Sequence, residues 1–242
     1  MFKKGVVGRL ATILGVLTFS AGLALSGFAA ESSLSPDEAL QKLVEGNKRY
    51  VENQMTGTKL CDLATRAGLA KSQKPYAIIL TCSDSRVPPE IVFDKGLGEI
   101  FVIRVAGNVP DPIVLGSIEY AAEHLGSPLI MVLGHERCGA VTATVDSHGK
   151  TTGSRNIDAI VKAIEPAVKS ALKDCEACKG EKKCAETRKS ELVECAIDAN
   201  AKRVAASLPL KSKIIKHLLE EKKIKIVVAK YDLDDGVVSL LK

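Results

Sequence analysis

Two short apolar runs, each followed at once by chemically reactive residues, constrain this 242-residue chain most strongly. Residues 76–81 lead into Cys82, and residues 129–133 lead into Gly134 and His135. Runs of this length and composition predict buried β-strands. In parallel α/β sheets, ligands bind at the edge where the strands end. We therefore expect the residues that follow the two runs to meet at one edge of a parallel sheet.

The rest of the chain alternates between helical and strand-like patterns. This alternation implies an α/β fold with a mostly parallel sheet that helices cover on both faces. An Asp-Gly turn at residues 235–236 predicts a terminal hairpin. Residues 54–74 look loop-like, and the two prolines at 88–89 predict an extended exit from the first strand. Further strands are expected at 100–105 and 224–229, and helices at 36–53, 113–124, 157–172, 192–208 and 211–221.

The N-terminus has the pattern of a secretory signal. A short basic segment, Met1 to Arg9, precedes an apolar stretch, and small residues precede a cut before Ala30. We therefore predict a signal peptide at residues 1–29 and one domain at residues 30–242, located in the periplasm or secreted, with no stable membrane association after cleavage. The alternative is an uncleaved membrane anchor, because the apolar stretch is nearly long enough to span a bilayer.

Charge argues against a nucleic-acid partner. The formal net charge of the whole chain is +5, but three basic residues lie in the predicted signal. Without them, 31 basic residues face 29 acidic ones. This balance gives no basic surface of the kind that nucleic acids require.

Cysteine and histidine at the two predicted strand ends indicate a metal site. Cys82, His135 and Cys138 suit zinc, since a catalytic zinc site keeps three protein ligands and one open position. Asp84 can accept a hydrogen bond from metal-bound water or become a fourth ligand, and Arg86 can hold it off the metal. Cys138 begins a predicted helix, which favours a lowered thiol pKa. The rival interpretation is a redox site with a Cys82–Cys138 disulfide.

Four motifs together resemble the β-class carbonic anhydrases, and the resemblance extends from about residue 37 to residue 236. It implies zinc-dependent, reversible hydration of carbon dioxide to bicarbonate and a proton, with zinc-bound water as the nucleophile. It also implies a four-stranded parallel sheet with an added edge strand, an N-terminal helical arm, and a homodimer or homotetramer. The motifs are Cys82-Ser-Asp-Ser-Arg86, Arg104-Val-Ala-Gly-Asn108, Gly116-Ser-Ile-Glu-Tyr120 and Gly134-His-Glu-Arg-Cys138-Gly139.

The resemblance also suggests individual roles. It implies Asp84 and Arg86 as the catalytic pair, with Asp84 as a fourth ligand in a closed state. Gln73 matches a substrate-binding glutamine, and Tyr120 and His124 match proton-transfer residues, although both also suit a packed helix. The zinc ligands it implies are Cys82, His135 and Cys138. The tryptophan that marks bicarbonate-regulated members is replaced here by Ile79, so that form of regulation is not expected.

A cysteine-rich insert at about residues 173–195 departs from the family pattern. Its four cysteines could form a second zinc site, but their Lys-rich flanks and the predicted export favour disulfides. Cys175 and Cys178 are too close in sequence to be good partners within a regular helix. With Cys61 the extra cysteines number five, so one is left free or bridges two subunits. The five candidates are Cys61, Cys175, Cys178, Cys184 and Cys195.

Two other functions stay open at the level of sequence. A hydrolase of carbonyl sulfide or carbon disulfide can be built on the same scaffold, because pocket shape rather than motif decides the substrate. A zinc-holding or redox-sensing protein without turnover is the alternative of another class, but it leaves Asp84 and Arg86 without a role.

Overall fold

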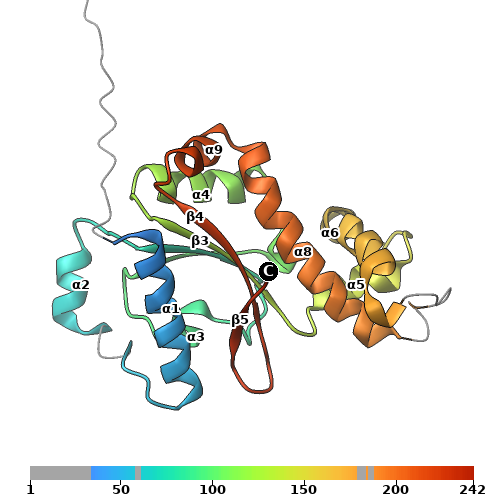
Figure 1. Ribbon diagram of the computed structural model, residues 1–242, viewed down its shortest axis with the longest axis horizontal. Helices are drawn as coiled ribbons and strands as arrows, with labels where there is room; N and C mark the ends of the chain where they lie inside the picture. Colours follow the sequence, from blue (N-terminus) through green and yellow to red (C-terminus); the bar gives the residue numbers. More distant parts are fainter. Residues whose placement is uncertain (1–33, 58–60, 179–183, 185–187) are drawn as a thin grey trace, which may run out of the picture.

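The computed structural model describes residues 34–57, 61–178, 184 and 188–242 (Figure 1). The predicted signal peptide at residues 1–29, and with it the alternative of a membrane anchor, lies outside these residues. Within the described ranges, no helix is both long enough and apolar enough to cross a membrane.

A five-stranded sheet forms the centre of the fold, in the order β2-β1-β3-β4-β5. The first four strands run parallel, and the last pairs antiparallel with β4 to close the predicted hairpin. This confirms the predicted α/β fold with a mostly parallel four-stranded sheet and an added edge strand. The strands are β1 (Ala77–Thr81), β2 (Ile100–Arg104), β3 (Leu129–His135), β4 (Lys225–Tyr231) and β5 (Val238–Leu240).

Helices cover both faces of this sheet (Figure 1). Alternate residues of β1 point to opposite faces: Ile78 and Leu80 pack with α4, α8 and α9, whereas Ile79 packs with α1 and α3. The central strands β1 and β3 are therefore buried along their whole length. The helices are α1 (Pro36–Val51), α2 (Leu63–Leu69), α3 (Pro89–Val92), α4 (Pro112–Glu123), α5 (Gly139–Ser147), α6 (Arg155–Asp174), α8 (Lys189–Lys211) and α9 (Lys213–Glu220), with short 3₁₀ turns η2 (Ala106–Asn108) and η3 (Glu176–Cys178).

The N-terminal helix α1 begins where the sequence predicts. The Ser35 hydroxyl accepts a hydrogen bond from the backbone N–H of Glu38, and the Glu38 carboxylate accepts one from the backbone N–H of Ser35, which completes a capping box. Asn47 then ties α1 to the rest of the fold: its side chain donates to the carbonyls of Val92 and Gly236. This helix thus joins the chain segment after β1 to the C-terminal hairpin.

Two short helices correct the sequence-based expectations. The segment 54–74, expected to be a loop, contains α2, which Asp62 caps. None of its residues is buried, so no amphipathic pattern marked it. The two prolines do not produce a purely extended exit, because Pro89 occupies the first turn of α3, where its missing N–H costs nothing.

A third apolar cluster lies beside the edge where the parallel strands end. It joins α5, α6, η3 and the first half of α8, and it contains Cys82 and Cys138 together with the described cysteines of the insert. The insert therefore packs next to the predicted metal ligands rather than extending away from them.

Candidate metal centre

The three predicted zinc ligands come together at the carboxyl edge of the sheet. Cys82 directly follows β1, His135 is the last residue of β3, and Cys138 caps the start of α5. Because β1 and β3 are parallel neighbours, their ends lie side by side. One ligand atom from each residue lies within 4.8 Å of the other two, and all three residues are buried.

The histidine ring is oriented for metal binding. His135 Nδ1 lies 2.8 Å from the carbonyl of Glu136, so this nitrogen carries the proton and donates it. Nε2 then presents a lone pair, and among the described residues this buried atom has no hydrogen-bond partner. A buried polar atom without a partner is costly, and a metal ion would satisfy it. The residues present therefore fit a metal ion.

The thiols of Cys82 and Cys138 interact directly. A hydrogen bond from Cys138 lowers the pKa of Cys82; burial opposes this shift, and the backbone N–H of Gly107, 3.4 Å from the sulfur, supports it. The interaction of Cys138 with Cys82, together with burial, raises the pKa of Cys138. The neighbouring Cys82, and not the helix N-terminus alone, therefore determines how Cys138 holds its proton.

Asp84 and Arg86 form a bidentate pair next to these ligands. The guanidinium donates through Nε and Nη2 to the two carboxylate oxygens, over 2.9 and 2.7 Å. These bonds hold the pKa of Asp84 well below its usual range. One carboxylate oxygen of Asp84 lies 3.9 Å from Nε2 of His135. The pair predicted from sequence is therefore formed, with its acceptor group facing the candidate metal position.

Arg104 supports this site in a way that the sequence analysis missed. It ends β2 beside the end of β1 and donates to the backbone carbonyls of Cys82 and Asp84. It therefore fixes the loop that carries one thiol and the carboxylate. A signal was available: an arginine at the carboxyl end of a strand adjacent to the cysteine strand lies within reach of that loop.

Gln73, Tyr120 and His124 lie elsewhere in the single chain. Gln73 is exposed and precedes β1, at the opposite end of that strand from Cys82. Helix α4 ends at the same edge, since Ser127 shortly after it donates to the carbonyl of Pro75. The Tyr120 and His124 rings contact each other there, with centroids 5.4 Å apart. The roles suggested for these three residues stay predictions.

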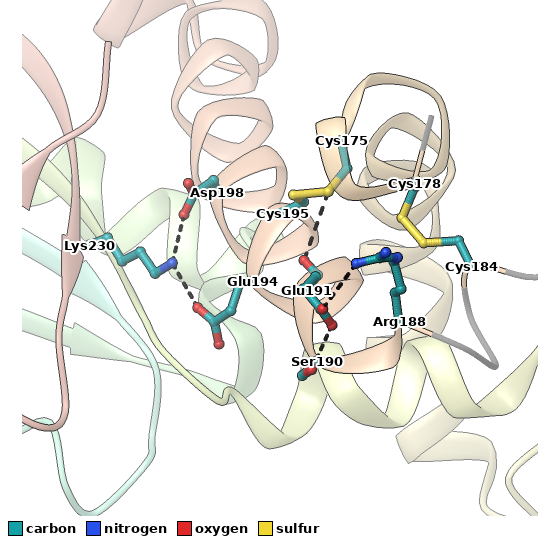
Figure 2. Close-up of a disulfide and its surroundings, with 10 residues drawn as sticks. All are labelled: Cys175, Cys178, Cys184, Arg188, Ser190, Glu191, Glu194, Cys195, Asp198 and Lys230. Atoms are coloured by element: carbon teal, nitrogen blue, oxygen red, sulfur yellow. Dashed lines mark hydrogen bonds and ion pairs between the residues drawn. A yellow bond between two sulfur atoms is a disulfide. The ribbon is translucent and has the colours of Figure 1, made fainter. Parts of the chain in front are cut away.

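The insert cysteines form disulfides, as preferred from the sequence. Cys175 pairs with Cys195, and Cys178 pairs with Cys184 (Figure 2). No thiol of these four is left to ligate a second zinc ion. Cys61 is the unpaired one of the five, exposed as a free thiol.

Cys82 and Cys138 also remain free thiols, so the redox alternative of a disulfide between them is not what the structure shows.

Fold and site together define a class. A parallel α/β sheet holds a buried Cys-His-Cys set at its carboxyl edge, with an Asp-Arg pair beside it, which is the arrangement of a metal-dependent enzyme rather than of a closed structural zinc site.

Comparisons with known proteins carry this one step further. The family model described as carbonic anhydrase matches residues 77–238. Carbonic anhydrase 2 of Mycobacterium tuberculosis is 45% identical over 141 residues, which cover 58% of this chain and 68% of the relative. The carbonic anhydrase of Mycolicibacterium smegmatis is 44% identical over 135 residues, covering 55% and 65%. The solved β-carbonic anhydrase of Coccomyxa aligns with a TM-score of 0.64 at 25% identity, covering 84% of this chain and 86% of that one. The chain belongs to the carbonic anhydrase family and to its β class, which confirms the predicted family and enzyme class.

Proposed function

We propose that this protein catalyses the reversible hydration of carbon dioxide to bicarbonate and a proton, with one zinc ion held by Cys82, His135 and Cys138. The observation that carries the proposal is the buried, unpartnered Nε2 of His135 beside two thiols and the Asp84 carboxylate. Family membership supports the same reaction. Zinc in such a site acts as a Lewis acid and lowers the pKa of a water ligand to near neutrality.

The protein residues control how water is held. Because the pKa of Asp84 is well below its usual range, the carboxylate stays ionised at neutral pH and accepts hydrogen bonds instead of storing a proton. Arg86 orients this acceptor and keeps it away from the ligand set. A closed state with Asp84 as a fourth ligand requires Arg86 to release at least one of the two oxygens. The proton leaves through a relay or buffer. Because Tyr120 and His124 lie at the opposite edge of the single chain, the relay role proposed for them requires a second copy of the chain.

Assembly and location are part of the proposal. A single chain does not bring Gln73 to its own site, so its proposed substrate contact requires a second copy of the chain. We propose a homodimer or homotetramer, and the half-exposed Val44 and Val51 on α1 offer apolar contact area. The pattern of residues 1–29 supports export to the periplasm or beyond, and the two disulfides are consistent with an oxidising compartment.

Stopped-flow measurement of carbon dioxide hydration by the purified protein tests the proposal. Sulfide release from carbonyl sulfide and carbon disulfide is measured on the same sample. Rapid hydration with little sulfide release supports the proposed substrate. Sulfide release with slow hydration would instead identify the hydrolase alternative, and neither activity in zinc-loaded protein would favour a role without turnover.

A further inference from the structure

We propose that Glu194 is a positioning residue for the metal centre, and that the Cys175–Cys195 disulfide fixes the part of α8 that carries it. The inference deepens the proposed function and rests on it in one respect, that the Cys-His-Cys set holds a metal ion. It concerns how this chain keeps two of its ligands in place.

The first step is the contact between Glu194 and the turn that separates two ligands. Oε1 of Glu194 accepts a hydrogen bond of 2.9 Å from the backbone N–H of Arg137. Arg137 lies between His135 and Cys138 and has a left-handed backbone, with φ of 49°. A non-glycine residue in this region persists only where its surroundings hold it. Glu194 supplies such a restraint directly at the strained residue.

The second step is that the same turn connects to Asp84. The carbonyl of Arg137 accepts a hydrogen bond of 3.4 Å from Nη2 of Arg86. The same nitrogen also donates to the Asp84 carboxylate. The backbone of Arg137 is therefore held at its N–H by Glu194 and at its carbonyl by Arg86. A shift of this residue would disturb the ligands and the Asp84 pair together.

The third step is the anchor of Glu194 itself. Lys230 on β4 lies 2.7 Å from Glu194 Oε2 and 3.3 Å from Asp198, and its side chain is only 19% exposed (Figure 2). Burial alone would lower the pKa of Lys230, but its bond to Glu194 and the two carboxylate charges outweigh burial and raise that pKa. Lys230 also lies opposite Gly134 in the sheet register, next to His135. This ion pair therefore links α8 to β4, beside the end of β3 that carries the histidine.

The fourth step is the disulfide adjacent in sequence. Cys195 follows Glu194 on α8, and its bond to Cys175 connects α8 to the C-terminal cap of α6 (Figure 2). Glu194, Cys195 and Arg137 line one groove of about 950 Å³ that is open to solvent. The cross-link limits how far this part of α8, and with it Glu194, can move.

Three variants of matched size separate positioning from general stability. Glu194→Met removes the acceptor for the Arg137 N–H at nearly constant volume. Glu194→Gln loses the same charge but keeps an oxygen acceptor. Asp198→Asn removes the other carboxylate partner of Lys230 without touching the turn. Two readouts are used: the rate of zinc transfer to a chelator, and the visible absorption spectrum of the cobalt-substituted protein, which reports ligand geometry.

We expect Glu194→Met to release zinc about ten times faster or more, with an altered cobalt spectrum, as found when residues that support metal ligands are removed. The rate of zinc release from Glu194→Gln should stay within about threefold of the wild-type rate, well below the change expected for Glu194→Met. The rate for Asp198→Asn should match that of wild type. Equal behaviour of the Met and Gln variants, or a wild-type spectrum and release rate for Glu194→Met, would overturn the proposal.

The disulfide is tested in the same assay with its neighbour as control. Cys175→Ser/Cys195→Ser should accelerate zinc release, whereas Cys178→Ser/Cys184→Ser should not. Equal effects of the two double variants would remove the special role of the Cys175–Cys195 link. Wild-type protein that binds no zinc would defeat the proposed function instead, so the two failures are distinguishable.

Discussion

The carboxylate of Asp84 lies 3.9 Å from Nε2 of His135, yet both of its oxygens are held by Arg86. The acceptor is thus close to the candidate metal position without being free to occupy it. This relationship supports the proposed roles of Asp84 in the chemistry and of Arg86 in controlling it.

Replacing Asp84 should separate catalysis from metal binding. Asp84→Ala removes the acceptor but none of the three predicted ligands, so we expect zinc content to stay at the wild-type level. The rate of carbon dioxide hydration should fall by about a hundredfold or more, the range for loss of a group that takes part in proton transfer. Stopped-flow assays and metal analysis on one sample check both points. Asp146→Ala, which removes an exposed ion pair with Lys189, is the control. Unchanged hydration in Asp84→Ala would refute the role of the pair.

Arg104 should matter for activity although it touches no ligand atom. Arg104→Met removes the donors to the carbonyls of Cys82 and Asp84, and we expect hydration to fall by about tenfold because the loop loosens. Arg66→Met, on a helix without buried residues, should have no effect. If both variants keep wild-type rates, the loop does not need Arg104.

Two glycines should respond oppositely to alanine. Gly107 has φ of +67°, and an added Cβ would lie 2.5 Å from Ile164. We expect Gly107→Ala to reduce the free energy of unfolding by about 1–3 kcal/mol. Gly68 lies in the exposed helix α2 with open space around it, so Gly68→Ala should stabilise by about 0.5–1 kcal/mol. Urea unfolding of both variants measures the difference, and equal shifts would contradict the strain argument.

Asp94 should make stability depend on acid pH. Burial raises its pKa, but bonds from Arg49, Gly57 and Thr56 outweigh burial and lower that pKa below 3.8 in the folded state. The unfolded chain therefore binds the proton first as pH falls, and the stabilisation present above about pH 4 is lost as pH falls through the folded pKa.

Asp94→Asn should accordingly cost about 1–3 kcal/mol of unfolding free energy at pH 7. The difference in unfolding free energy between this variant and wild type should become smaller below about pH 4. Denaturant unfolding across pH 2.5–7, a range set around the usual Asp pKa, gives the comparison. A gap independent of pH would mean that the Asp94 charge does not stabilise the fold.

The strands and metal ligands could be predicted because burial leaves a local trace in sequence. Residues 77–81 and 129–133 are almost continuously apolar since both faces of the sheet are covered, and a candidate ligand lies within two residues of the end of each run. Helix α2 left no such trace because it buries nothing, and only Asp62 marked its start.

Contacts between residues that are far apart in the chain could not be predicted from the sequence in the same way. The Lys-rich, exported context favoured disulfides but could not show that Cys175 pairs across to Cys195, since sequence does not determine connectivity. Glu194 lies 57 positions from Arg137, and only the packing of α8 against β3 and β4 brings them together. The raised pKa of Cys138 likewise depends on Cys82, which a strand distant in sequence supplies.

The most direct test of the central claim is metal depletion followed by stepwise return of zinc, with carbon dioxide hydration measured at each step. The account predicts no hydration above the buffer rate in depleted protein, and hydration that rises in proportion to zinc and stops at about one ion per chain, as three ligands at a single site require. Full hydration without zinc, or a fully loaded chain that does not hydrate carbon dioxide, would contradict it.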